Sequence, residues 1–197
     1  MTAKEKILTT IRATTPEETP LPSLEGLGLT FDNPLESFKT MLESVGGALI
    51  EDGELRMEDG GWRSMLECYY PDAKVIASTV PGCDITTLDL DTITDPHDLS
   101  TVDLAMVQAE FAVAENGAVW VKNPANRHRA LYFIAAQLLF VVPRGEIVHT
   151  MHEAYEQIGF EKGGFGCFIS GPSKTADIEQ ALVIGAHGAT SARVVFV

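Results

Sequence analysis

Short apolar runs alternate with amphipathic patterns of helical spacing along most of this chain. The apolar runs lie at residues 48–50, 75–77, 102–107 and 138–142. Helical patterns lie at residues 34–45, 61–69 and 146–158. Because parallel strands are joined by long crossovers, usually helices, this alternation predicts an α/β domain. We expect a mainly parallel sheet with helices on both faces.

An Asn-Gly pair predicts an antiparallel part of the sheet. Asn116 and Gly117 stand between two apolar runs, residues 111–114 and 118–121. Asn-Gly between apolar runs is the strongest short hairpin signal. Glu115 precedes the pair at the end of the first run. It can act as a base or nucleophile if burial raises its pKa, or it is an exposed hairpin charge.

The C-terminal block predicts a strand, a polar turn, a helix and a strand. The apolar run 165–169 stops at Ser170-Gly-Pro-Ser173, and residues 178, 181, 182 and 185 then recur at helical spacing before the apolar run 193–197. In an open α/β sheet, a turn between a strand and a helix N-terminus is a usual ligand site. We therefore expect the turn to lie at the carboxyl edge of a parallel strand, close to Glu115, and to hold an anion. The predicted ligand-binding residues here are Ser170, Gly171, Ser173, Lys174, Thr175 and Asp177.

Several of the candidate residues also have a structural alternative. Ser173 or Thr175 can cap the expected helix. Asp177 lies in its first turn and offsets the positive helix end. His187 stabilises the end of that helix, or it belongs to the site together with Gly188.

Two blocks of the sequence resemble a known family. Ser170-Gly-Pro-Ser-Lys-Thr-Ala-Asp-Ile-Glu179, followed by Gly185-Ala-His-Gly188, is similar to the C-terminal signature of the lactate utilization (LUD) domain, LutC/YkgG type. Ala114-Glu-Asn-Gly-Ala-Val-Trp-Val121 resembles the family's Ala-Glu-Thr-Gly-Thr and the strand after it. Asn116 and Ala118 replace hydroxyl residues, and Ala189 replaces a proline.

The resemblance implies a fold, a function and partners. The fold is that of ribose-5-phosphate isomerase, glucosamine-6-phosphate deaminase and the CoA transferases (NagB/RpiA/CoA transferase-like). The implied function is that of a subunit in a cytoplasmic complex that oxidises L-lactate to pyruvate with Fe–S oxidoreductase subunits of a lactate utilization operon. It adds weight to Glu115 as the catalytic residue, with Asn116 and Gly117 beside it, and to His187 and Gly188 as site residues. The alternative is a stand-alone enzyme or sensor that binds a CoA-type or sugar-phosphate anion.

The cysteines indicate that this chain binds no Fe–S cluster by itself. Cys68, Cys83 and Cys167 show no CxxC spacing, and a cluster normally needs about four thiolates. His149 and His152 share a helix face without a suitable carboxylate, so we expect no metal site. We therefore expect no cofactor in this chain and Fe–S clusters in partner subunits.

Length and charge limit the remaining possibilities. The 197 residues, 45% of them hydrophobic, suit one α/β domain over residues 23–197, preceded by a helix and proline-containing linker over residues 1–22. That helix packs on the body or on a partner. A net charge of -14 argues against nucleic-acid binding. The basic cluster Arg127-His-Arg129, with Lys122, receives an acidic substrate or partner, or it is a solvated loop.

Two features predict a cytoplasmic protein. The first residues lack the apolar core of a signal peptide. The longest apolar stretch, residues 130–142, is too short to span a bilayer.

Overall fold

The computed structural model describes residues 2–14, 19–20, 22–23, 28–51, 61–123, 128–159, 164–178 and 181–197. Within this part, no helix is long and apolar enough to cross a membrane. Most of the expected linker lies outside the described residues. The domain boundary at residue 22 stays a prediction.

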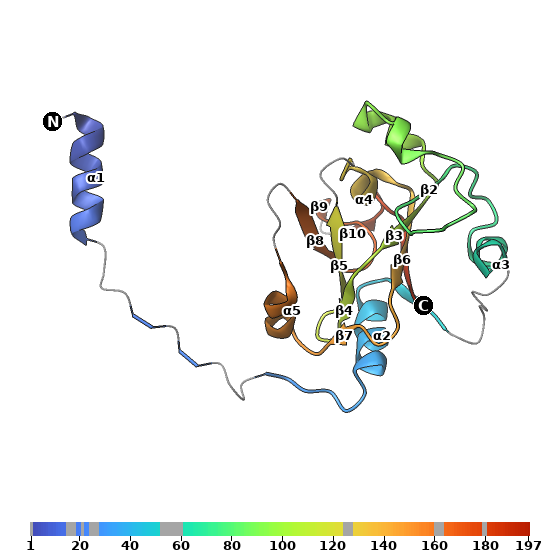
Figure 1. The fold of residues 1–197 in the computed structure, drawn as a ribbon, viewed down its shortest axis with the longest axis horizontal. Helices are drawn as coiled ribbons and strands as arrows, with labels where there is room; N and C mark the ends of the chain where they lie inside the picture. The colour runs from blue at the N-terminus through green and yellow to red at the C-terminus, as the bar shows by residue number, and fades with distance from the viewer. Residues whose placement is uncertain are drawn as a thin grey trace.

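A five-stranded parallel sheet forms the centre of the molecule (Figure 1), as predicted. Its strands are β1 (Ala48–Ile50), β11 (Ser191–Phe196), β6 (Gln137–Val142), β3 (Leu104–Gln108) and β2 (Ile76–Ser78), in that spatial order. Four parallel pairings join them. The inner strands β3 and β6 are almost continuously buried, which is typical of parallel strands covered on both faces.

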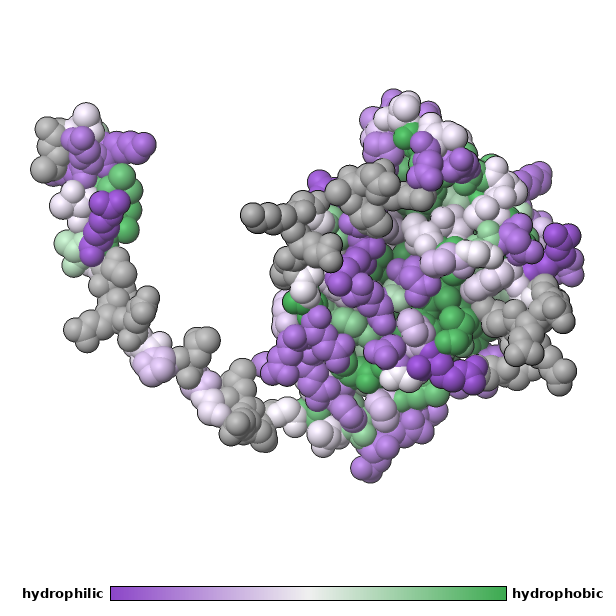
Figure 2. Space-filling model, in the orientation of Figure 1, coloured by the Kyte–Doolittle hydropathy of each residue, from purple (hydrophilic) through white to green (hydrophobic). Residues whose placement is uncertain are grey.

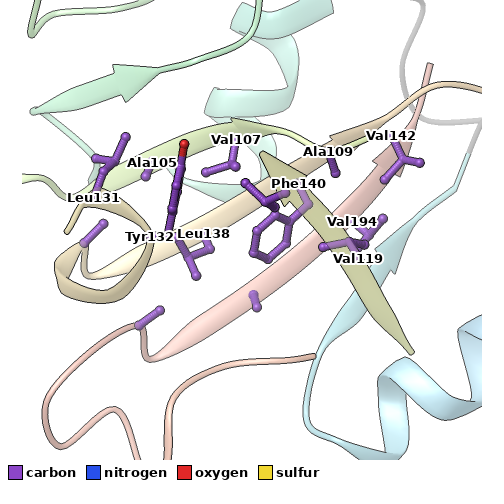
Figure 3. Packing of buried hydrophobic residues seen from close by; sticks show 14 of the residues in the cluster. Ala105, Val107, Ala109, Val119, Leu131, Tyr132, Leu138, Phe140, Val142 and Val194 are labelled. Atoms are coloured by element: carbon purple, nitrogen blue, oxygen red, sulfur yellow. The ribbon is translucent and has the colours of Figure 1, made fainter. Parts of the chain in front are cut away.

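Successive residues of β3 point to opposite faces of the sheet and into different cores. Ala105 and Val107 join a cluster with Phe38 and Leu42 of α2 (Pro34–Ser44). Figure 3 shows part of this cluster, where Val107 lies beside Phe140 of β6. Leu104 and Met106 instead pack with Met65 of α3 (Gly61–Tyr69) on the other face. The short helix α4 (Leu131–Ile134) adds to the first cluster.

A second sheet packs against the α2 side of the central sheet. Its order is β7 (Ile147–Val148), β4 (Phe111–Val113), β5 (Ala118–Asn123) and β8 (Phe165–Ile169). The strands β4 and β5 are antiparallel, which confirms the hairpin. Residues 114–117 connect them, and Gly117 takes a φ of 64°. Ala112 and Val119 reach the shared core.

The expected helix over residues 146–158 is wrong at its start. Ile147 and Val148 form β7 and pair with β4. The helix α5 (Met151–Gln157) begins only after Thr150, whose hydroxyl accepts a hydrogen bond from the Glu153 amide. The Glu153 carboxylate accepts one from the His149 amide in return. This reciprocal capping sets the helix start later than the apolar periodicity suggests.

The expected helix between Ile178 and Gly188 is also wrong. The chain forms a separate hairpin there, β9 (Lys174–Ile178) and β10 (Ala181–Ile184). Both segments are short and contain β-branched residues, for which helical and extended patterns are hard to distinguish. The preceding strand β8 pairs antiparallel with β5, so it is not one of the parallel strands.

The N-terminal helix α1 (Ala3–Thr14) forms as predicted, but it buries no residue. Figure 1 shows it standing apart from the body, upstream of α2. Packing of its apolar face on the body is therefore not what the structure shows. The loop-rich stretch before β3 contains two 3-10 turns, η1 (Leu90–Thr92) and η2 (Pro96–Thr101).

Candidate functional site

The turn after β8 packs against the end of α2. Gly171 has a φ of 69°, and a Cβ added to it would lie 2.6 Å from the carbonyl oxygen of Val45. The Lys174 ammonium donates a hydrogen bond to that same oxygen at 2.6 Å. A cation at a helix C-terminus satisfies a free carbonyl and complements the helix dipole. The turn thus closes over the end of α2.

The β4–β5 loop, which contains Glu115, contacts this turn. The sequence predicted that the turn and Glu115 lie close together. The Ser170 hydroxyl donates to the Asn116 carbonyl oxygen at 2.9 Å. The Asn116 side chain accepts from the Ala118 amide and shapes its own loop. Gly117 lies so close to α2 that an added Cβ would be 2.6 Å from the Leu42 amide nitrogen. Only glycine allows this approach.

Ser173 lies against the segment that enters β11. Its amide donates to the Ala189 carbonyl oxygen, and its own carbonyl oxygen accepts from the Gly185 amide. A Cβ on Gly188 would lie 3.1 Å from the Ser173 hydroxyl oxygen and 2.7 Å from the Phe133 carbonyl oxygen. The Ser173 hydroxyl makes no hydrogen bond within the described part of the chain.

These residues lie at the amino edge of the central sheet. Val45 precedes β1, and Ala189 precedes β11. The expectation of a carboxyl-edge site is wrong, because β8 belongs to the second sheet and no helix follows the turn. We call the residues that meet here the amino-edge cluster: Asn116, Gly117, Ser170, Gly171, Ser173, Lys174 and Gly188.

Glu115 stands next to this cluster in sequence and binds the start of α5. Its carboxylate accepts a hydrogen bond from the Met151 amide at 2.7 Å, and its own amide donates to the His149 carbonyl oxygen. The Met151 amide is one of the donors that a helix N-terminus leaves without an intrahelical partner. Glu115 is half-buried, so it is not simply an exposed hairpin charge.

Three predicted site residues have surroundings different from those expected. Thr175 pairs with Val183 in the β9–β10 hairpin, and Asp177 also lies in β9, so neither residue begins a helix. His187 is exposed in the connection from β10 to β11 and ends no helix. None of the three can cap or neutralise the expected helix.

The basic cluster is engaged in internal contacts. Arg129 lies over the Phe165 ring, 4.9 Å from its centroid, and His128 contacts the Ile93 carbonyl oxygen at 3.2 Å. Lys122 pairs with Glu110 at 3.0 Å. Arg127 lies outside the described residues. The described part of the cluster is therefore not an open receptor for acidic groups.

The described residues contain no group of three metal-ligating side chains. His149 accepts a hydrogen bond from the Phe31 amide through Nδ1 at 3.0 Å, so its neutral form carries the proton on Nε2. The three cysteines lie in α3, after β2 and in β8. Burial raises the pKa of the Cys167 thiol to about 11, which disfavours the thiolate that ligates metals.

Comparison with known families places the chain. The model of the LUD domain matches residues 94–197, more than half of the sequence. This chain belongs to the LUD domain family. The match includes Glu115, the amino-edge cluster and the strands β3 to β11. The elements α1, α2, β1, α3 and β2 precede it.

Several curated relatives share this LUD region. Lactate utilization protein C of Geobacillus kaustophilus is 37% identical over 97 residues, which cover 45% of this chain and 40% of that protein. The protein of the same name from Geobacillus thermodenitrificans is 30% identical over 77% of this chain and 63% of its own length. The one from Bacillus pumilus is 24% identical over 93% and 70%. The match thus spans 40% of the length of some of these relatives, which is less than half.

A solved structure supports the fold assignment. The crystal structure of a DUF162 family protein from Deinococcus radiodurans aligns with a TM-score of 0.63 at 20% identity. The alignment covers 85% of this chain and 98% of that one. At this identity the likeness establishes the α/β fold alone.

The sequence reasoning missed a pocket at the opposite, carboxyl edge of this LUD fold. The pocket has a volume of about 450 Å³, within the size range of ligand pockets. The start of α2, the ends of β1 and β11, and the turn after β6 line it, with Leu35, Lys39, Glu51, Arg144 and Phe196 among its residues. Lys39 and Glu51 form an ion pair there. A helix that begins at Asn33-Pro34 ahead of the first strand was the available signal, because helices that precede parallel strands start at the carboxyl edge.

Proposed function

We propose that this chain serves in L-lactate utilization, as a subunit that works with Fe–S oxidoreductase partners to oxidise lactate to pyruvate. The observation that carries the proposal is the LUD match over residues 94–197, together with relatives named lactate utilization protein C. The partners and the oxidation go beyond those names. Three dispersed cysteines in this chain suit a subunit whose clusters are supplied by others.

We further propose that Glu115 and the amino-edge cluster carry the contribution of this subunit. The cluster joins the two sequence blocks of the family resemblance through the bond from Ser170 to Asn116. Among the described residues the Ser173 hydroxyl has no hydrogen-bond partner, and we propose that it binds a ligand or a partner protein.

The stand-alone enzyme or sensor is the weaker alternative. Its physical basis was an anion held at a helix N-terminus after the turn. Because β9 follows the turn instead, that positive helix end does not exist. A CoA-type or sugar-phosphate ligand would have to be held in some other way.

Growth of a deletion strain on L-lactate tests the proposal. A clean deletion should impair growth on lactate and leave growth on glucose unchanged. The wild-type gene should restore growth on lactate. Ser173→Ala and Glu115→Gln should fail to restore it while the protein remains folded, because both changes keep the packing and alter one polar group. The matched control Thr9→Ala removes an exposed hydroxyl of α1 and should restore growth.

Two results would count against these proposals. Normal lactate growth of the deletion strain, with no paralogue present, would remove the lactate role. Wild-type growth with both site variants would leave that role intact and show that the amino-edge cluster is structural.

A further inference from the structure

The helix α1 exposes an aliphatic stripe. Ile7 and Leu8 are 59% and 40% exposed, and Ile11, at 57%, continues the same face. Figure 2 shows hydrophobic side chains gathered along one side of the helix. A helix of 12 residues is marginally stable alone in water and gains most of its stability by burying its apolar face. We therefore expect the stripe to pack against another protein surface.

Charge favours the helix's own body as that surface. α1 carries Lys4, Lys6 and Arg12 against Glu5, a net charge of +2. The whole chain carries -14, so the rest of the chain carries -14 - 2 = -16. A basic helix is attracted to such an acidic body.

The chain connection leads α1 to the carboxyl-edge pocket. Residues 15–32 separate α1 from Asn33, and Asn33 and Pro34 themselves line the pocket. Eighteen extended residues span at most about 60 Å, so the tether easily reaches from the rim back over the pocket. Joining two binding surfaces in one chain raises their effective concentration, which reaches the millimolar range for short linkers.

The pocket offers apolar walls for an aliphatic stripe. Leu35, one of the lining residues, is 43% exposed. Leu49, Ile147 and Phe196 are half-buried around the pocket. Glu36 lies among the lining residues and can face the lysines of α1, while Glu51 is paired with Lys39. Aliphatic anchors one turn apart in a groove with charged flanks are the usual features of helix-in-groove binding.

We propose that α1 docks its Ile7, Leu8 and Ile11 stripe into the carboxyl-edge pocket of its own chain. The detached helix of Figure 1 is then the open state of a two-state equilibrium. In the docked state α1 covers the carboxyl edge of the central sheet, which is where open α/β folds bind ligands. The inference is independent of the lactate proposal, because it concerns the purified chain alone.

Hydrogen exchange of the full-length chain tests the docking. With an effective concentration of about 1 mM, a docking constant of about 0.1 mM slows exchange of the α1 amides about tenfold. Ile7→Asp with Leu8→Asp should abolish this protection, and so should Leu35→Asp on the pocket side. The control pair Thr9→Asp with Ala13→Asp adds the same charge to the opposite face and should keep it. Ile184→Asp, at a site 47% exposed and outside the pocket, should also keep it.

Three results would overturn the proposal. The first is exchange of the wild-type α1 amides at the rate of an unstructured peptide. The second is protection that grows with protein concentration, which would place α1 on a second copy. The third is protection that survives Leu35→Asp, which would place α1 on another surface.

Discussion

Gly171, like Gly117, combines a left-handed φ with a backbone contact too close for a Cβ, so the packing of the amino-edge cluster depends on it. Its φ of 69° lies in the left-handed region, and an added Cβ would lie 2.6 Å from the Val45 carbonyl oxygen. Gly82 has a similar φ of 72° but nothing within 4 Å of its added Cβ. The two glycines thus separate the cost of the dihedral angle from the cost of the contact.

We predict that Gly171→Ala lowers the free energy of unfolding by about 2–3 kcal/mol, since it adds a steric contact to the backbone strain. Gly82→Ala should cost about 1 kcal/mol, from the dihedral angle alone. Chemical denaturation of both variants measures the difference. Equal losses would mean that the turn moves away from α2 without cost.

Tyr70 links stability to alkaline pH. Burial raises the pKa of Tyr70 from 10.0 to about 12, against the opposing effect of Arg193. The folded protein therefore holds the phenolic proton at a pH where the unfolded chain has released it. Its contribution is fully present below pH 10 and is lost as the pH rises toward 12.

We predict that wild type loses about 2–3 kcal/mol more stability between pH 9 and pH 12 than Tyr70→Phe does. Phenylalanine fits the same core and has no proton to release. Denaturation curves of the two proteins at several pH values provide the comparison, and all other groups cancel in the difference. Parallel pH profiles would show that Tyr70 does not titrate with a raised pKa.

Among the elements, α2 has a start that is fixed by a single side chain. The Asn33 side chain accepts a hydrogen bond from the Glu36 amide, and Pro34 occupies the first turn. Asn33→Ala should lower stability by about 1 kcal/mol, because the cap is lost. Asp32→Ala, at the exposed neighbouring position, should change it by less than about 0.5 kcal/mol. Equal effects in thermal unfolding would contradict the capping role.

The elements that the sequence predicts well are those with a strong local signal. Continuous apolar runs predicted β3 and β6, the helical pattern over residues 34–45 predicted α2, and Asn116-Gly117 predicted the hairpin. The hairpin β9–β10 has no such signal, since its segments are short and read equally well as a helix. The pairing of β8 with β5 depends on tertiary packing, which no local pattern reports. Because of this pairing, the turn after β8 lies at the amino edge of the central sheet and not at the predicted carboxyl edge.

The site also shows that features with a local sequence signal are predicted better than contacts between distant elements. The sequence correctly brought Ser170 to the β4–β5 loop, because each belongs to a recognisable block. It did not predict that Lys174 binds the end of α2 or that Glu115 binds the start of α5. Those contacts join elements distant in sequence, and no local pattern reports them.

In the whole molecule, the two edges of the central sheet carry different features. The amino edge holds the family's sequence blocks, and the carboxyl edge holds a pocket beside the tether of α1. We propose that lactate oxidation needs Fe–S partner proteins in addition to this chain.

The most direct measurement is purification of the tagged chain from lactate-grown cells, compared with the same chain purified alone from a foreign host. We expect the native preparation to contain Fe–S proteins, to show their visible absorbance and to oxidise L-lactate to pyruvate. The isolated chain should show no such absorbance and should not oxidise L-lactate. Lactate oxidation by the isolated chain, or a native preparation without Fe–S partners, would contradict it.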